Sequence, residues 1–147
     1  MLLPFKPLME GVWKGEGKWK DGKPFKQEIA WSWGIGNQHV DYEVKSFLDT
    51  AGTSFGLAAK GTHSWDQKEN KIRFWSFDVH GTVLEGIVKT KRKQLHYVYD
   101  YPMGDGTTVT LTEAWIWIKD DKYMNKIGVL EGEEWKEIYG EFYFWNK

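Results

Sequence analysis

His63 is the side chain best placed by type and position for acid–base chemistry. It lies in the alternating stretch 55–66, where period two puts it on the same face as Leu57 and Trp65. An imidazole titrates near neutral pH and can bind a ligand or transfer a proton. The structural alternative is a core imidazole that hydrogen-bonds a neighbouring Tyr or Glu, because buried polar groups usually find partners.

Glu113, on another predicted strand, could likewise have either a chemical or a structural role. It stands between Leu111 and Trp115 on an apolar face, where a lone carboxylate is costly unless it is paired. It could pair with an internal Tyr, His or Arg, or it could be an acid–base group whose pKa is raised by burial. If both strands face inward, His63 and Glu113 belong to one interior polar cluster with Tyr97 or Tyr99.

Arg73 is the one arginine that could reach such an interior. It lies in the stretch 71–79, which is apolar on both faces, so the inner face stays open. Arg73 points inward only if Trp75 and Phe77 do, and it would then meet an acidic ligand group or pair with Glu113. The remaining histidines are predicted outside: His39 and His96 alternate with inward residues, and His80 falls in a turn.

Aromatic residues are unusually abundant, with 10 Trp, 7 Tyr and 8 Phe. They could build a core, or they could line a pocket whose tyrosines favour a flat, partly polar guest. The predicted ligand-binding set consists of these rings and the titratable residues above: Trp31, Trp33, Tyr42, His63, Arg73, Trp75, Tyr97, Tyr99, Glu113, Trp115 and Tyr139. Glu137 and Glu141 share a face with Tyr139, Tyr143 and Trp145, so they raise the same question.

Composition excludes several classes of function. The chain of 147 residues has no cysteine, which removes disulfides, thiol catalysis and zinc–thiolate sites. A net charge of -1 gives no reason to expect nucleic acid or an anionic membrane as partner. Phosphate loops, nucleophile elbows and dinucleotide fingerprints are absent. The opening residues are too interrupted for a signal peptide, and no apolar run approaches the ~20 residues of a membrane helix. We expect a cytoplasmic monomer or homodimer without a bound cofactor or metal.

Alternating patterns that are separated by turn residues predict about ten strands and no amphipathic helix. A short cap at 4–10, in part a helical turn, precedes them. The predicted strands are 12–20, 25–33, 38–48, 55–66, 71–79, 82–91, 94–101, 107–118, 123–130 and 135–145. Sequential hairpins favour a single all-β domain, an antiparallel up-and-down β-barrel, over a sandwich, since closure also removes exposed strand edges.

The first predicted strand carries two glycines on its inner face. Trp13, Gly15, Gly17 and Trp19 alternate with mainly charged residues. Glycine packs no side chain and costs chain entropy in a strand, so we expect a sharp bend or a close approach of another group here.

These residues also carry a family resemblance. Gly11-x-Trp13-x-Gly15-x-Gly17, preceded by Pro7-Leu8, resembles the first-strand signature of calycin-type, lipocalin-like barrels. It is most similar to that of nitrobindin-like haem-binding barrels and neighbouring uncharacterised families. Phe74-Trp75-Ser76-Phe77-Asp78-x-x-Gly81 and Glu113-Ala114-Trp115-Ile116-Trp117 are similar to later strands of those families.

The resemblance implies a calycin barrel and, for nitrobindin-like members, ferric haem held by a histidine near the C-terminus. The stretch 123–145 contains no histidine. Many calycins also lay a basic residue from the last strand over the first-strand indole. Here the arginines are Arg73 and Arg92, and only Lys147 is near the end. The resemblance therefore supports the barrel fold more strongly than it supports haem binding.

Four functions remain open. The first is non-catalytic binding of a small hydrophobic or aromatic molecule in the lumen. The second is a barrel enzyme of isomerase or hydratase type that uses an internal His, Glu or Tyr. The third is haem or tetrapyrrole binding, by analogy of fold. The fourth is a carbohydrate-binding sandwich with exposed Trp platforms, which a closed barrel would count against.

Overall fold

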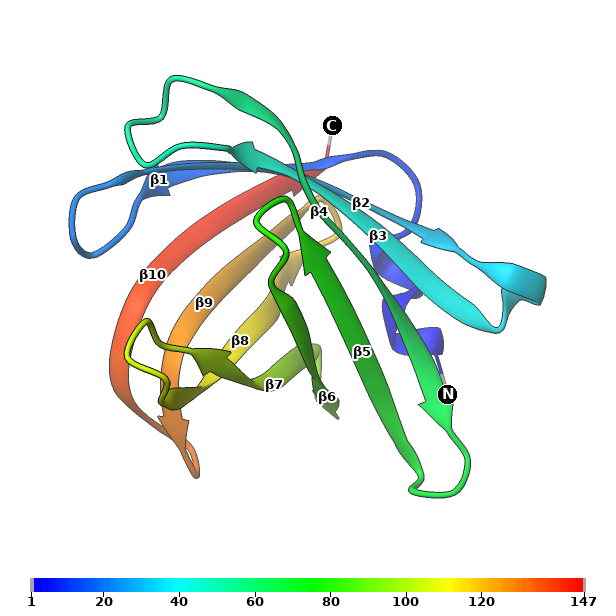
Figure 1. Cartoon of the computed structure of the whole chain (residues 1–147). Coiled ribbons are helices and arrows are strands. Elements are labelled where there is room, and N and C mark those ends of the chain that lie inside the picture. Colours follow the sequence, from blue (N-terminus) through cyan, green and yellow to red (C-terminus); the bar gives the residue numbers. More distant parts are fainter. Residues whose placement is uncertain (1, 147) are drawn as a thin grey trace.

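Ten strands form a closed antiparallel barrel in the computed structural model, which describes residues 2–146 (Figure 1). They are β1 (Trp13–Lys18), β2 (Pro24–Trp33), β3 (His39–Phe47), β4 (Phe55–Asp66), β5 (Lys71–Asp78), β6 (Val83–Lys91), β7 (Gln94–Pro102), β8 (Thr108–Lys119), β9 (Lys122–Glu131) and β10 (Glu134–Asn146). Each strand pairs with its neighbours in sequence, and β1 closes the ring by pairing with β10. The predicted up-and-down barrel is confirmed.

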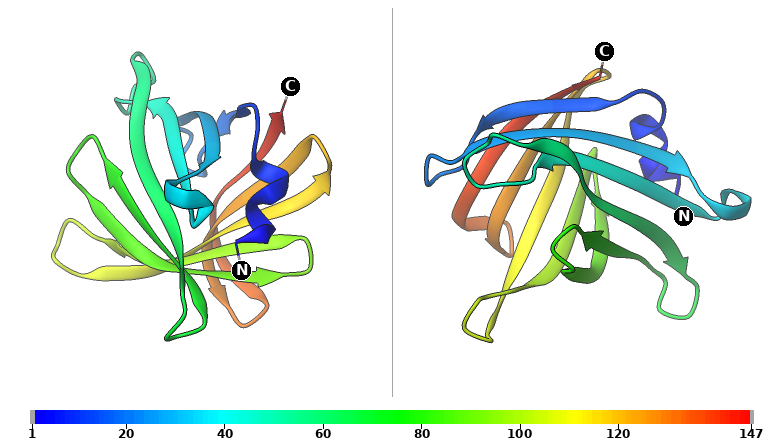
Figure 2. Two further views of the ribbon diagram at one scale, coloured as in Figure 1. Left: turned by 90° about the vertical axis from the view of Figure 1, so that its right-hand side faces the viewer. Right: turned by 45° about the horizontal axis from the view of Figure 1, so that its top comes forward.

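A 3-10 helix, η1 (Leu3–Leu8), caps one end of the barrel and leads into β1 (Figure 2). Its Phe5 and Leu8 are buried, and Trp13 Nε1 donates a hydrogen bond to the Leu8 carbonyl at 3.1 Å. A second 3-10 turn, η2 (Ile35–Asn37), lies between β2 and β3. No helix within residues 2–146 is long and apolar enough to cross a membrane. The cap fills the end of the barrel that would otherwise expose the core.

The two glycines of β1 lie where β10 comes close. A Cβ added to Gly15 would lie 3.0 Å from the Phe144 ring, and one added to Gly17 would lie 3.2 Å from Phe142. The expectation of a close approach at this strand is confirmed, because the two phenylalanine rings occupy the space that side chains on β1 would need.

A β-bulge in the β3–β4 pairing changes which residues of β4 face inward. Val44 pairs with Ala59, but Lys45 pairs with Leu57, so Ala58 is the extra residue. Leu57 is 41% exposed, and its predicted place on the inner face with His63 is wrong. The bulge resets the alternation, so that beyond it alternate residues face the interior, and His63 is buried there as predicted, whereas Lys60 is exposed.

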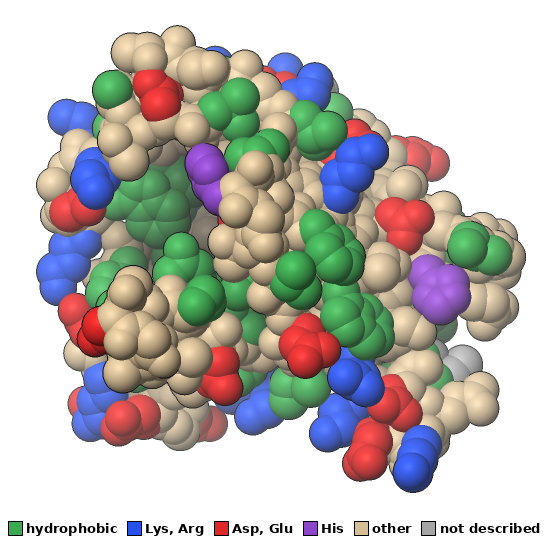
Figure 3. Space-filling view, viewed as in Figure 1, with side chains coloured by type: hydrophobic (Ala, Val, Ile, Leu, Met, Phe, Trp, Pro, Cys, Tyr) green, Lys and Arg blue, Asp and Glu red, His purple; other side chains and the backbone are tan. Residues whose placement is uncertain are grey.

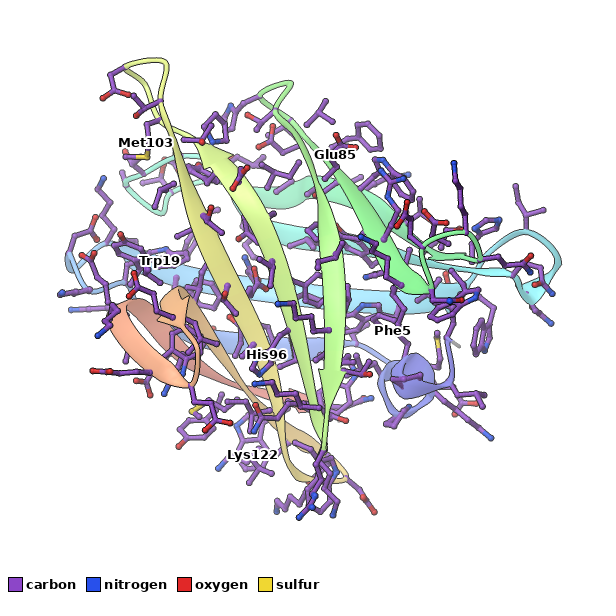
Figure 4. The ribbon with its side chains drawn as sticks, turned by 90° about the horizontal axis from the view of Figure 1, so that it is seen from below. Phe5, Trp19, Glu85, His96, Met103 and Lys122 are labelled. Carbon is purple, nitrogen blue, oxygen red and sulfur yellow. The ribbon has the colours of Figure 1, made fainter. Side chains whose placement is uncertain are left out.

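The interior is packed at the cap end and beside β1 and β10. Figure 4 shows Phe5, which belongs to the cap, at one end of the barrel and Trp19 toward the opposite end. Phe5 packs on His63 with ring centroids 4.4 Å apart, while Trp19, Phe25 and Phe142 form a second ring cluster. The remaining interior, enclosed by β2 to β8, is hollow.

Candidate functional site

A cavity of about 320 Å³ occupies the barrel interior away from the cap. Figure 3 shows the hollow with apolar side chains inside it and a histidine at its rim. Six residues of the predicted ligand-binding set line it: Trp31, Tyr42, Tyr97, Tyr99, Glu113 and Trp115. Its volume equals that of roughly ten water molecules, which suits one small guest.

His63 lies behind this cavity rather than in its wall. Its Nδ1 is 2.8 Å from the Val40 carbonyl, which can only accept, so Nδ1 carries the hydrogen. Nε2 therefore accepts from the Tyr97 hydroxyl, 2.7 Å away. The side chain is 0% exposed, and burial lowers the pKa of His63 to about 4. The ring is a neutral core imidazole with both nitrogens engaged, which was the structural alternative for this residue.

Glu113 presents its carboxylate to the cavity. Asn125 Nδ2 donates to Oε2 at 3.0 Å, and the Tyr99 hydroxyl donates to Oε1 at 3.5 Å. Burial raises the pKa of Glu113, and hydrogen bonds from Asn125, Trp115 and Tyr99 oppose that rise. β7 and β8 pair Tyr97 with Glu113, so Tyr97, which hydrogen-bonds His63, lies on the strand next to Glu113. The hydrogen bonds of Glu113 go to other residues, Asn125 and Tyr99.

The cavity tyrosines stay neutral at physiological pH. Burial raises the pKa of Tyr42 to about 12, even though the Ser76 side chain hydrogen-bonds it. Burial also raises the pKa values of Tyr97 and Tyr99 well above the ordinary range, and the charge of Glu113 adds to both rises. These phenols can therefore donate or accept hydrogen bonds but do not supply an anion.

Trp31 contributes a polar group that the protein leaves unpaired. Its side chain is 5% exposed, and its Nε1 has no hydrogen-bond partner among residues 2–146. The indole lies near the Tyr97 hydroxyl, whose pKa it lowers slightly, without a hydrogen bond of normal geometry. A buried unpaired donor is costly, and Trp31 is one of the residues that line the cavity.

Arg73 and Trp75 do not reach the interior. The inner face of β5 carries Ile72 and Phe74, both buried. Arg73 lies outside, 3.6 Å from Asp66 and 3.8 Å from Glu85, and its guanidinium stacks on the Trp75 ring at 5.1 Å. Their predicted inward orientation is wrong, because both faces of this strand are apolar and alternation could not choose between them.

Trp33 and Tyr139 also lie outside the cavity. Trp33 ends β2 at the cap end, in a surface groove with Leu3 and Trp65. The Tyr139 hydroxyl donates to Glu137 at 3.1 Å on the exposed side of β10. That strand is bulged between Ile138 and Gly140, and its inner face carries Gly140, Phe142 and Phe144, so Glu141, Tyr143 and Trp145 point outward.

His96 was expected to be exposed, and it is buried instead. It is 6% exposed and its Nε2 donates to Gln94 Oε1 at 2.7 Å. Burial lowers the pKa of His96, with a further contribution from the positive charges of Lys91 and Lys89. Its place outside the lumen is as predicted, but side chains on the outer wall cover it.

Sequence reasoning missed the residues at the mouth of the cavity. Phe47, Asp78, Val79, His80 and Leu84 surround the opening. The Asp78 carboxylate holds the turn by accepting backbone N–H groups of His80 and Thr82, each at 2.9 Å. The His80-Gly81 turn was visible in the sequence, but its position over the opening depends on how the barrel closes.

The residues present do not fit a histidine-ligated haem inside the barrel. His63 has both ring nitrogens engaged and does not line the cavity, while His80 lies at the rim. β9 and β10 contain no histidine. Residues 2–146 hold no group of three or more side chains arranged to bind a metal ion.

No family model matches the sequence, and no curated protein matches it. The function must therefore be argued from the geometry of the cavity.

Proposed function

We propose that this protein binds one small, flat, partly polar aromatic or hydrophobic molecule in its lumen, within a calycin-type, lipocalin-like barrel. The observation that carries the proposal is the cavity of about 320 Å³ in an otherwise packed interior, walled by Trp31, Tyr42, Phe74, Tyr99 and Trp115. Ring-lined cavities with a few convergent polar groups are typical ligand sites. The unpaired Trp31 Nε1 and the Glu113 carboxylate are such groups.

The geometry favours binding over acid–base catalysis. A general base must reach the proton that it removes, but His63 is fully enclosed and both its nitrogens are engaged. Tyr97 and Tyr99 hold their protons because burial raises their pKa values. Glu113 and Asp78 present carboxylates to the cavity among the described residues, and both are engaged: Glu113 by Asn125 and Tyr99, and Asp78 by the backbone of its turn.

A titration with the neutral dye N-phenyl-1-naphthylamine tests the proposal. Ala59 lines the cavity, so Ala59→Trp should fill it, whereas Ala51 is exposed in the β3–β4 loop, so Ala51→Trp is the matched control. We expect saturable dye fluorescence and Trp quenching in wild type and Ala51→Trp, and loss of both in Ala59→Trp. Val44→Phe blocks the same space if Ala59→Trp folds poorly. Absence of binding to wild type, or equal binding to the blocked variants, would refute a lumen site.

A further inference from the structure

None of the ion pairs formed by residues 2–146 involves the carboxylate of Glu113. Among the described residues that line the cavity, none is a lysine or an arginine. Its hydrogen-bond partners, Asn125, Tyr99 and Trp115, are neutral. The negative charge of Glu113 acts on the neighbouring phenols, because it contributes to raising the pKa values of Tyr42, Tyr97 and Tyr99. A buried carboxylate without a cation is the uncommon arrangement, because buried charges are normally paired.

The hydrogen bonds at Glu113 leave room for a further donor. Oε2 accepts a bond of normal length from Asn125 Nδ2 at 3.0 Å, while the Tyr99 hydroxyl is 3.5 Å from Oε1. The Trp115 side chain is a third donor, and a carboxylate has about four acceptor sites. The Asn125 amide nitrogen can only donate, so Oε2 acts as an acceptor in this pair. An ammonium group brings three donors and a compensating charge, and charge-assisted bonds are the stronger kind.

The walls around Glu113 also suit a cation. Trp31, Tyr42, Tyr99 and Trp115 line the same cavity, and the faces of such rings attract positive charge. Asp78 adds a second carboxylate at the mouth. The cavity therefore combines carboxylates and aromatic rings in a space of about 320 Å³, which is roughly the volume of ten water molecules.

We propose that the ligand is an aromatic amine whose protonated nitrogen pairs with Glu113 while its ring packs among the cavity aromatics. This assignment rests on the proposed function, because it requires the lumen to be a binding site. It names the chemical class of the guest: a flat body of one or two rings with a short aminoalkyl arm. A hydrogen-bond acceptor elsewhere on the guest could take the free N–H of Trp31.

Calorimetric titration with three matched indoles at pH 7 tests the assignment. Tryptamine is a cation, tryptophol is its neutral alcohol analogue and indole-3-acetate is an anion. We expect wild type to bind tryptamine about tenfold tighter than tryptophol, and indole-3-acetate most weakly. Glu113→Gln should reduce the affinity for tryptamine to that for tryptophol. Glu16→Gln removes the same charge from the exposed face of β1 and should leave the order unchanged.

The outcomes distinguish the amine assignment from the proposed function, which is binding of a ligand in the lumen. If tryptophol binds wild type as tightly as tryptamine, or if Glu113→Gln keeps the preference, the amine assignment is wrong while the lumen remains a binding site. If neither the indoles nor the neutral dye binds, the proposed function itself fails. Glu113→Met, without charge and of similar volume, replaces Glu113→Gln if that variant folds poorly.

Discussion

Acidification from pH 7 to pH 4 should weaken the fold through His63. The ring is fully buried, and burial lowers the pKa of His63 to about 4 in the folded protein. In the unfolded chain the ring returns to water and to a pKa of about 6.5. The unfolded state therefore takes up a proton at a higher pH than the folded state does, and each step down in pH favours unfolding.

The size of the effect follows from the two pKa values. The difference of 6.5 minus about 4 is about 2.5, and at 1.36 kcal/mol for each pKa unit this gives about 3 kcal/mol. Because the folded-state pKa is the lower one, this contribution is fully present above pH 6.5. It is lost as the pH falls from about 6.5 to about 4. A loss of this size is a large part of the 5–15 kcal/mol that stabilises a typical domain.

Urea unfolding followed by Trp fluorescence at intervals between pH 7 and pH 4 measures this loss. Carboxylates titrate in the same range, and Glu113 acts in the opposite direction because its pKa is raised. The difference between wild type and His63→Gln isolates the histidine. We expect that difference to shrink by about 3 kcal/mol toward pH 4. His39→Gln removes a histidine from the outer face of β3 and should follow wild type throughout.

Parallel wild-type and His63→Gln curves across this range would refute the reasoning. If His63→Gln is too unstable to measure, the NMR titration of the wild-type His63 ring decides the matter. A midpoint near 6.5 would show that the ring is not held neutral by burial and by its bonds to Val40 and Tyr97.

Two further outcomes are expected. Gly61→Ala should lower stability by about 1–3 kcal/mol, because its Cβ would press on the Tyr42 ring and on the Trp75 carbonyl, whereas Gly104→Ala, with open space around it, should be nearly neutral; thermal unfolding of both variants checks this. Titration with haemin should give no sharp Soret shift, because His63 offers no free nitrogen to iron; a sharp shift that His63→Ala abolishes would contradict this expectation.

The sequence was sufficient to predict the strands and their order. Most strands show a period of two, and most turns contain a glycine, an aspartate or an asparagine, so this information is local. The short connections then leave an up-and-down meander as the simplest topology. Gly15 and Gly17 likewise predicted that another group lies close to β1. The rings of Phe144 and Phe142 on β10 occupy that position.

Alternation failed where both faces of a strand are aromatic. On β5, Ile72 and Phe74 are buried in the interior, whereas Trp75 lies on the outer face and is covered by Arg73. On β10, Trp145 lies on the outer wall, with Lys122 Nζ 4.4 Å from its ring centroid. Lysine and arginine side chains cover such rings, so an outward Trp need not be a misplaced core residue. The sequence of one strand cannot state which of two apolar faces its distant neighbours will bury.

The chemistry of the candidate site was decided by closure of the barrel. Sequence placed His63 and Glu113 on inner faces, but β4, β7 and β8 had to meet before Tyr97 could bond His63 and face Glu113. Whether the lumen is packed or hollow also depends on the sum of side chains from seven strands. Alternation is a property of neighbouring residues and can be read from the chain. A cavity, and a carboxylate without a counter-ion inside it, are properties of residues that only tertiary packing brings together.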